Sequence, residues 1–192
     1  MEIISRTTAV VLLIILSPFL LIIGLGNLIL QGRPIIYRQK RVGKDFKEFL
    51  IYKFRTMKNK DAGVDNFSSG QTTTLTKWGR FLRKTKLDEL PQLANIIKGD
   101  MRFIGPRPEV PEYVSQDSFS FLSIIKPGLS GFSSILFRNE SEIWSMIESE
   151  DPYRDILKIK VGLANYYVNK KSFFQDLKLV FITIMSLFIP KR

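Results

Sequence analysis

The feature that most constrains this chain is a long apolar run near its N-terminus, at residues 7–30. The run is long enough to cross a bilayer as one helix. It is too long for a signal peptide, its basic start is too weak, and it has no small-residue cleavage site. Ser17-Pro18 interrupts it near the middle. Proline bends a helix by removing a hydrogen bond, and a serine hydroxyl can satisfy part of the freed backbone. Two topologies stay open: a spanning helix, and a re-entrant helix that enters and leaves by one face.

Basic residues are frequent after this run, whereas Arg6 is the single cation before it. By the positive-inside rule, the chain that follows the run faces the cytoplasm. We therefore divide the protein into a membrane helix at residues 1–32 and a cytoplasm-facing catalytic domain at residues 33–192. The formal net charge of +11 indicates an anionic partner: nucleic acid, acidic lipid headgroups or a phosphorylated substrate.

Composition restricts the chemistry, because the chain contains neither Cys nor His. Thiol nucleophiles and Cys-based zinc sites are excluded, and so is histidine as a general base, the role in which it is commonest. An enzyme built from this sequence has to use carboxylates, Lys, Arg, hydroxyls or a hard metal ion.

The expected fold class is α/β, mostly helical with a small β-hairpin. The hairpin is predicted from β-branched and aromatic runs at residues 34–37 and 46–56, around a turn at 43–45. A polar loop is expected at 61–74 and a strand at 132–137. Helices are expected at residues 75–84, 90–98, 141–148, 153–168 and 173–189. The last helix is too short to span a bilayer, so it suits either an amphipathic helix in the membrane interface or packing in the core.

An acidic pair, Asp88-Glu89, lies in the most basic part of the chain, directly after Arg83 and Lys86. Pro91 suits the first turn of the helix at 90–98, which places both carboxylates at a helix N-terminus. The macrodipole there favours carboxylates and anionic ligands. Taken alone, the pair favours helix capping over a functional site.

Cations that suit phosphate lie on both sides of this pair. Lys53 and Arg55 alternate along one face of a predicted strand, which can present two positive charges together. Arg107 stands between Pro106 and Pro108, which hold it in a stiff, extended backbone. A rigidly held guanidinium can grip phosphate with paired hydrogen bonds.

Five motifs in order resemble one family, the bacterial sugar transferases, or monotopic phosphoglycosyl transferases. They are Ser17-Pro18 in the apolar helix, Lys53-Phe54-Arg55-Thr56-Met57, Arg83 with Leu87-Asp88-Glu89-Leu90-Pro91-Gln92, Gly105-Pro106-Arg107-Pro108, and Pro127-Gly128-Leu129-Ser130-Gly131. The resemblance implies a re-entrant membrane helix broken at Ser17-Pro18 and a catalytic domain on the cytoplasmic face of the bacterial inner membrane.

The resemblance also implies an activity: transfer of a phosphosugar from a UDP-sugar to a polyprenyl phosphate, with release of UMP and a need for Mg²⁺. In that reaction Asp88 is expected to be the nucleophile, and Glu89 either helps Asp88 to hold the metal or positions the second acceptor. Phosphate is neutralised by Lys53, Arg55 and Arg83 and by the segment Pro106, Arg107 and Pro108. The expected partners are the donor, the lipid acceptor and membrane lipid, without nucleic acid, and a homo-oligomer is left open.

A competing hypothesis is a membrane-tethered basic protein that binds nucleic acid or anionic lipid without catalysis. Charge alone supports it. The sequence adds no helix-turn-helix, zinc-finger or aromatic single-strand signature to that charge.

Overall fold

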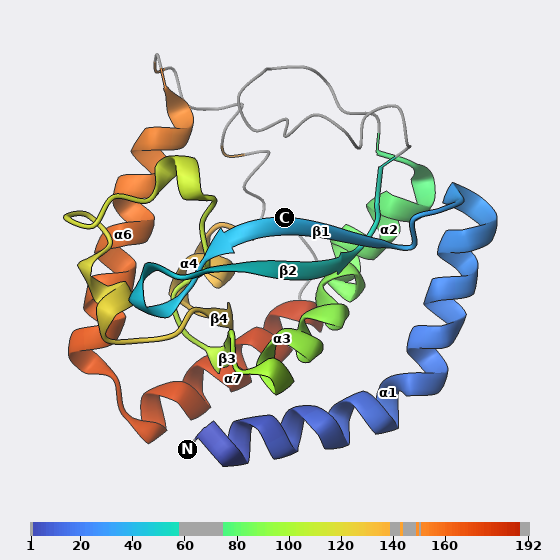
Figure 1. Ribbon diagram of the computed structural model, residues 1–192, viewed down its shortest axis with the longest axis horizontal. Coiled ribbons are helices and arrows are strands. Elements are labelled where there is room, and N and C mark those ends of the chain that lie inside the picture. The colour runs from blue at the N-terminus through green and yellow to red at the C-terminus, as the bar shows by residue number, and fades with distance from the viewer. Residues whose placement is uncertain (1, 58–74, 139–142, 144–148, 150, 189–192) are drawn as a thin grey trace. The chain divides into compact units, whose positions relative to one another are not determined.

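The computed structural model describes residues 2–57, 75–138, 143, 149 and 151–188, and Figure 1 shows the course of the chain. The loop expected at 61–74 lies outside the described residues, as does the helix expected at 141–148 apart from residue 143. The described chain is mostly helical with two small two-stranded sheets, as expected. It forms two compact units, Met1–Gln39 with Leu50–Lys98 and Lys40–Phe49 with Gly99–Arg192. The functional division at residue 32 stays a prediction.

Helix α1 (Glu2–Gln31) covers the apolar run and leaves most of its large apolar side chains exposed. Pro18 lies inside it, and the helix changes direction part-way along its length (Figure 1). Pro18 has no N–H for the carbonyl of Ile14, four residues earlier. The Ser17 hydroxyl donates to that carbonyl at 2.7 Å, which confirms the compensation expected for this pair. Among the described helices, α1 is the one long and apolar enough to cross a membrane.

A buried side chain, Asn27, attaches the C-terminal end of α1 to the rest of the first unit. Its Nδ2 donates to the carbonyls of Ile35 at 3.2 Å and Arg55 at 3.1 Å. Its Oδ1 accepts from Trp78 Nε1 at 2.7 Å and from Gln31 Nε2 at 2.8 Å. A buried amide whose polar atoms are all bonded fixes the groups around it. This end of α1 is therefore held in register with the backbone at Ile35 and Arg55 and with the Trp78 side chain.

The predicted hairpin is confirmed, with β1 (Ile36–Val42) paired to β2 (Glu48–Phe54). The connection contains the 3₁₀ turn η1 (Lys44–Phe46), where Asp45 and Phe46 have φ values of 56° and 57°. β1 runs five residues past the predicted end at residue 37. Its cations are compatible with a strand because alternate residues of β1 are exposed and one face of a small antiparallel sheet can lie in water.

The first unit continues with α2 (Lys77–Thr85), the 3₁₀ turn η3 (Leu87–Gln92) and α3 (Leu93–Lys98). Thr76 caps α2, because its side chain accepts from the backbone N–H of Gly79 at 2.8 Å. Gly79 is required there, since a Cβ would lie 1.9 Å from the carbonyl oxygen of Thr56. The apolar core of this unit is formed by Ile23, Phe54 and Leu82.

The second unit contains a parallel pair, β3 (Arg102–Ile104) and β4 (Gly128–Ser130). The strand predicted at residues 132–137 is wrong: these residues form helix α4 (Phe132–Leu136), and the strand is β4. The reason is the glycine at 128, where a Cβ would lie 2.1 Å from the Gly105 nitrogen. The close approach of these two backbones allows β4 to pair with β3, and the chain turns into α4 at Gly131.

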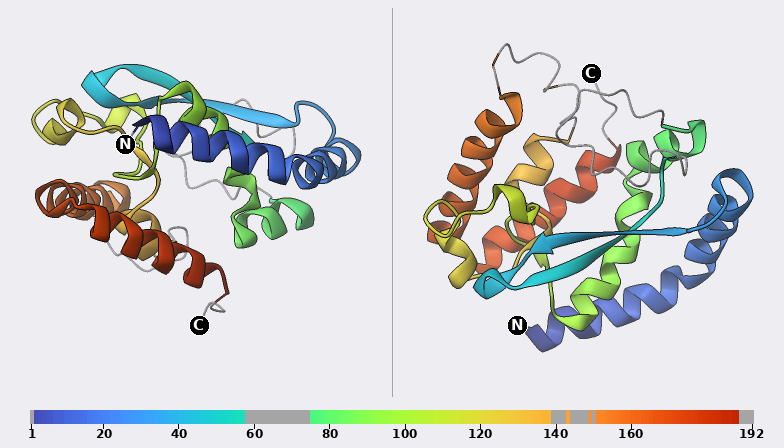
Figure 2. Two further views of the ribbon diagram at one scale, coloured as in Figure 1. Left: turned by 90° about the horizontal axis from the view of Figure 1, so that it is seen from below. Right: turned by 45° about the horizontal axis from the view of Figure 1, so that its top comes forward.

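Two short 3₁₀ turns, η4 (Pro111–Tyr113) and η5 (Ser120–Ser123), and two long helices complete this unit. The helices predicted at 153–168 and 173–189 are confirmed as α6 (Pro152–Lys170) and α7 (Phe173–Phe188), with residue 189 outside the described chain. α7 leaves α6 at an angle (Figure 2). It buries Leu179 in the core. Six of its large apolar side chains are exposed: Phe173, Phe174, Leu177, Phe181, Ile184 and Met185. Core packing is thus confirmed, and a place in the membrane interface stays a prediction.

Candidate active site

The acidic pair lies in η3, which runs directly into α3. The expected helix start at residue 90 is thus preceded by a tighter turn that contains both carboxylates. Lys86 begins this turn in the left-handed region, with φ 60°, and makes no side-chain capping bond. The backbone N–H of Glu89 donates to the Lys86 carbonyl at 3.2 Å. The first turn of η3 is therefore closed by backbone groups, and the capping interpretation of the pair stays a prediction.

Asp88 is a buried carboxylate, 6% exposed. Its Oδ1 is buried and accepts no hydrogen bond within the described chain. Burial is the largest influence on this carboxyl and raises its pKa, and the neighbouring Glu89 raises it further. The cations Lys53, Lys86 and Arg83 act in the opposite direction. The acceptor atom without a partner suits a metal ion, and the three cations suit a ligand that carries phosphate.

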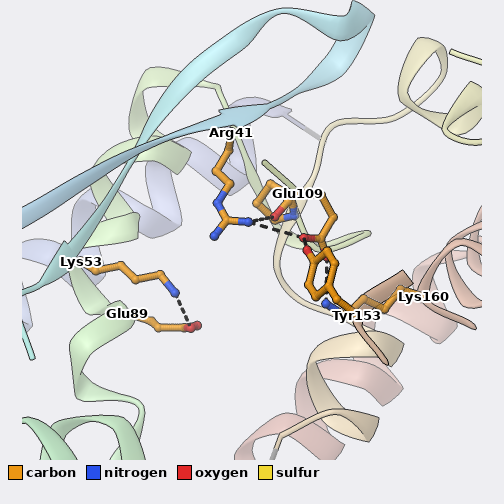
Figure 3. A network of polar contacts seen from close by, with 7 residues as sticks. Arg41, Lys53, Glu89, Glu109, Tyr153 and Lys160 are labelled. Atoms are coloured by element: carbon orange, nitrogen blue, oxygen red, sulfur yellow. Dashed lines mark hydrogen bonds and ion pairs between the residues drawn. The ribbon is translucent and has the colours of Figure 1, made fainter. Parts of the chain in front are cut away.

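Glu89 pairs with a cation from the hairpin. Lys53 lies on β2, and its Nζ is 3.0 Å from Glu89 Oε1, with both side chains mostly buried (Figure 3). The structure thus brings Lys53, Asp88 and Glu89 together although they are far apart in sequence. Arg83 joins them electrostatically from α2, where its Nε donates to the Thr56 hydroxyl at 3.0 Å.

Arg55 differs from its expected place beside Lys53. It follows the end of β2 and is 2% exposed. Its guanidinium donates to the carbonyl of Arg33 at 3.0 Å and of Gly32 at 2.8 Å, and also to that of Gln31. Those carbonyls end α1 and lead into the hairpin. These contacts support a structural role for Arg55, and phosphate binding by this residue stays a prediction.

The residues present fit a hard cation of the Mg²⁺ type. Mg²⁺ is usually held by one or two carboxylates, with water and substrate phosphates as its other ligands. Asp88 and Glu89 supply two adjacent carboxylates, and one of their oxygens is the unpartnered Oδ1. Among the described residues, no group of three or more acidic side chains lies together as a possible metal site.

The second unit contains Pro106, Arg107 and Pro108, with both prolines buried and Arg107 partly exposed. The backbone on either side of Arg107 is held by hydrogen bonds. The carbonyl of Pro106 accepts from Gly128 N at 2.8 Å, and that of Pro108 accepts from Arg41 Nη1 at 3.2 Å. These two hydrogen bonds are in keeping with the stiff backbone expected around Arg107, which stays a prediction, as does its contact with phosphate.

A buried network follows this segment at Glu109 (Figure 3). Glu109 Oε1 is 3.0 Å from Lys160 Nζ, and its Oε2 accepts from the Tyr153 hydroxyl at 2.7 Å. Arg41 Nη1 lies 3.5 Å from the same Oε2. Glu109, Tyr153 and Lys160 are each less than 8% exposed. Tyr153 and Lys160 both lie on α6, so this network connects the segment of Arg107 to that helix.

Sequence reasoning missed this network. It named Lys86, Thr56 and Gln92 near the acidic pair or within the motifs but predicted no role for them. A signal was present for Glu109, a carboxylate that directly follows the Pro-Arg-Pro segment. Tyr153 and Lys160 are seven residues apart in a predicted helix, which places them on one face. Nothing local indicated that this face is buried against a carboxylate.

The structure thus places two adjacent carboxylates close to Lys53, Arg83 and Lys86, on a chain that carries a long apolar helix. The protein belongs to the bacterial sugar transferase family, whose profile matches residues 1–190. This confirms the resemblance drawn from the five motifs.

Three curated relatives illustrate the match. The chain is 31% identical to the UDP-N-acetylgalactosamine-undecaprenyl-phosphate N-acetylgalactosaminephosphotransferase of Aeromonas hydrophila over 185 residues, 93% of this chain and 41% of the relative. It is 32% identical to the UDP-glucose:undecaprenyl-phosphate glucose-1-phosphate transferase of Escherichia coli K12, with coverage of 95% and 39%. It is 34% identical to the uncharacterized sugar transferase EpsL of Bacillus subtilis, with coverage of 83% and 73%. The chain thus spans about two fifths of the first two relatives and most of the third.

Proposed function

We propose that this protein is a phosphoglycosyl transferase that moves a phosphosugar from a UDP-sugar to undecaprenyl phosphate and releases UMP. The observation that carries the proposal is Asp88, a buried carboxylate with an unpartnered oxygen close to Lys53, Arg83 and Lys86. Two of the relatives are named as transferases of sugar phosphates to undecaprenyl phosphate, which supports the same reaction.

In the proposed first step, an Asp88 oxygen attacks the phosphorus that bears the sugar. A bond forms between that oxygen and phosphorus, and the bond from phosphorus to the bridging oxygen breaks. UMP leaves with the bonding electron pair, and an aspartyl phosphosugar remains on the protein. A carboxylate is a competent nucleophile for such covalent catalysis.

In the second step, a phosphate oxygen of the lipid acceptor attacks the same phosphorus. The new bond gives a lipid diphosphate sugar, and Asp88 is released as a free carboxylate. Each displacement exchanges one phosphorus–oxygen bond for another, so the reaction needs no oxidant, reductant or general base with a neutral pKa.

The cations of the site perform the electrostatic part of this chemistry. Phosphoryl transfer depends mainly on positioning and on stabilising charge at the phosphate oxygens. Lys53 holds Glu89 beside the reacting carboxylate, and Arg83 supplies a further positive charge. We assign Arg107 to neutralisation of a substrate phosphate. Mg²⁺, held by Asp88 and Glu89, supplies additional charge neutralisation when it is bound.

We assign the protein to the cytoplasmic face of the bacterial inner membrane, with α1 as a re-entrant helix. The bend in α1 and the exposed apolar side chains on both arms of this helix support the assignment. A re-entrant helix keeps both of its ends on the face where UDP-sugars are available. The lipid acceptor is embedded in the same bilayer, so its phosphate meets the protein at the interface.

The test is incubation of the purified protein with a panel of UDP-sugars and Mg²⁺, first without acceptor and then with undecaprenyl phosphate. With the correct donor alone, we expect UMP equal to the amount of enzyme and a phosphosugar adduct on the peptide that contains Asp88. Asp88→Asn should lose both the adduct and turnover by several orders of magnitude, as for other lost nucleophiles. Full turnover in EDTA would contradict the metal role.

A different result assigns a different mechanism. If UMP forms only after acceptor is added and rapid quenching finds no adduct, transfer is direct and Asp88 is not the nucleophile. If no UDP-sugar gives UMP under any condition while RNA or DNA binds with a steep salt dependence, the competing class of basic binding protein is the better account.

A further inference from the structure

Two polar residues occupy the inward side of η3. Among the six residues of this turn, Asp88 and Gln92 are the buried ones, at 6% and 2% exposure. Their apolar neighbours Leu87 and Leu90 are only partly buried. Both leucines pack against the core of Ile23, Phe54 and Leu82. The turn therefore buries two polar side chains in addition to its apolar ones, and burial of a polar group costs stability unless the group is hydrogen-bonded.

Both inward residues carry a polar atom without a partner. Within the described chain, Oδ1 of Asp88 accepts no hydrogen bond and Nε2 of Gln92 donates none. The first atom is an acceptor and the second a donor, and each is buried. Buried polar groups in native proteins nearly always have partners, and one left without a partner reduces stability.

A neighbouring amide shows that this region can satisfy a buried side chain. Asn95, three residues after Gln92, is fully buried. Its Oδ1 accepts from the Tyr52 backbone N–H at 3.1 Å, and its Nδ2 donates to the Leu50 carbonyl at 2.7 Å. Asn95 therefore holds β2 in place, whereas the donor of Gln92 has no partner among the described residues.

The chemistry of the turn indicates what that group is. An amide N–H is a neutral donor, and a non-bridging phosphate oxygen is a strong acceptor. A donor fixed near a reacting phosphorus stabilises the negative charge that gathers on such oxygens in the transition state, and it does so without altering the charge of the nucleophile. We propose that Gln92 is a substrate-contacting residue whose Nε2 donates to a non-bridging oxygen of the sugar phosphate during attack by Asp88. This inference rests on the proposed function.

The decisive variant is Gln92→Met, which keeps the size of the side chain and removes its polar atoms. If the donor of Gln92 serves the substrate, Gln92→Met should melt at the same temperature as the wild type or higher, because an unpartnered group is gone. UMP release should nevertheless fall roughly 10²- to 10³-fold, the usual loss for one donor to a developing oxyanion. Gln92→Glu, which puts a carboxylate in the same place, should lose at least as much.

The matched control is Asn95→Leu, an apolar substitution of equal burial on the adjoining helix. It should lower the melting temperature, because it breaks two hydrogen bonds to β2. A lower melting temperature in Asn95→Leu, together with an unchanged or higher one in Gln92→Met, would separate a substrate contact from a structural one. A loss of activity in Gln92→Met that merely follows a fall in melting temperature would overturn the inference.

Two further outcomes also overturn it. UMP release within about twofold of wild type in Gln92→Met would mean that the donor serves only a water molecule. A shift of the acidic limb of the pH–rate profile of Gln92→Met to higher pH would mean that the partner of Gln92 is Asp88 itself.

If the wild type releases no UMP from any UDP-sugar, the proposed function fails. The affinity of the protein for UDP then tests whether Gln92 contacts phosphate. Equal affinities of the wild type and Gln92→Met for UDP would then show that Gln92 makes no contact with phosphate.

Discussion

At Asp88, burial and neighbouring charge act on one carboxyl in opposite directions. Burial and Glu89 raise its pKa, while Lys53, Lys86 and Arg83 oppose that increase. Burial removes the water that would otherwise surround an ionised carboxylate, which makes it a better nucleophile and a costlier one to keep charged. The three cations keep the ionised form accessible. An arrangement of this kind is expected where function and stability conflict.

The raised pKa of Asp88 predicts a pH-dependent effect on stability. Below the ordinary pKa of an Asp carboxyl, about 4, the group is protonated in both states and contributes nothing. As pH rises through the raised pKa, the folded state has to hold a charge that burial disfavours, so stability is lost. Asp88→Asn should therefore melt at a higher temperature than wild type at neutral pH, with the gain vanishing below about pH 4.

Melting curves recorded from acidic to neutral pH check this prediction. The matched control is Asp155→Asn on α6. The pKa of Asp155 is lowered by hydrogen bonds from Ser149 and Lys158 and by the charge of Lys158, so neutralising it should not stabilise the protein at neutral pH. An Asp88→Asn protein that melts below wild type at neutral pH would show that the three cations outweigh burial.

At the scale of elements, the Glu109 network connects the segment of Arg107 to α6. Glu109 and Lys160 form a buried ion pair, and Tyr153 and Arg41 add further contacts to the carboxylate. A buried pair adds little net stability compared with an apolar pair, but removal of one partner leaves a buried charge without its counter-ion. The network therefore makes the position of this loop sensitive to residues on a helix more than 40 positions away.

Lys160→Met should destabilise the second unit by about 3 kcal/mol, the lower end for a broken buried ion pair, because Arg41 and Tyr153 still contact Glu109. Urea unfolding in detergent measures this loss. Lys158→Met is the control, since Lys158 lies on the same helix and pairs with Asp155 at 3.0 Å in an exposed position, where no measurable loss is expected. Equal midpoints for the two variants would contradict the prediction.

At the scale of the whole molecule, the re-entrant topology proposed for α1 depends on two features of this helix. The helix is long enough to span, but it bends within its length and its C-terminal end is fixed by the hydrogen bonds of Asn27. A re-entrant helix needs both of these features, a bend and a fixed end.

Single introduced cysteines test this topology. The chain contains no cysteine of its own, so a thiol reagent labels only the introduced one. Cysteines at Glu2 and at Lys40, both exposed, should be protected from an impermeant thiol reagent added outside intact cells. Pro18→Leu combined with Ser17→Leu restores the helical hydrogen bond and should expose the Glu2 position to that reagent. Labelling of Glu2→Cys in the otherwise unchanged protein would show that the helix spans.

The sequence by itself determined the features that depend on local chemistry. The apolar run, its Ser17-Pro18 pair, the hairpin and the two C-terminal helices follow from side-chain periodicity and from the missing N–H of proline. The family followed from motifs whose residues are contiguous. These features are encoded within a few neighbouring residues, so no distant contact was needed to find them.

Only the tertiary structure decided which groups meet. Lys53 pairs with Glu89, and Arg55 instead holds the carbonyls that end α1. The strand at residues 128–130 exists because two glycine-bearing backbones approach each other, which no local propensity predicts. The unpartnered atoms of Asp88 and Gln92 likewise depend on burial by residues far away in sequence. Burial and charge pairing are set by the packing of whole elements, whereas periodicity reports only which face each element will bury.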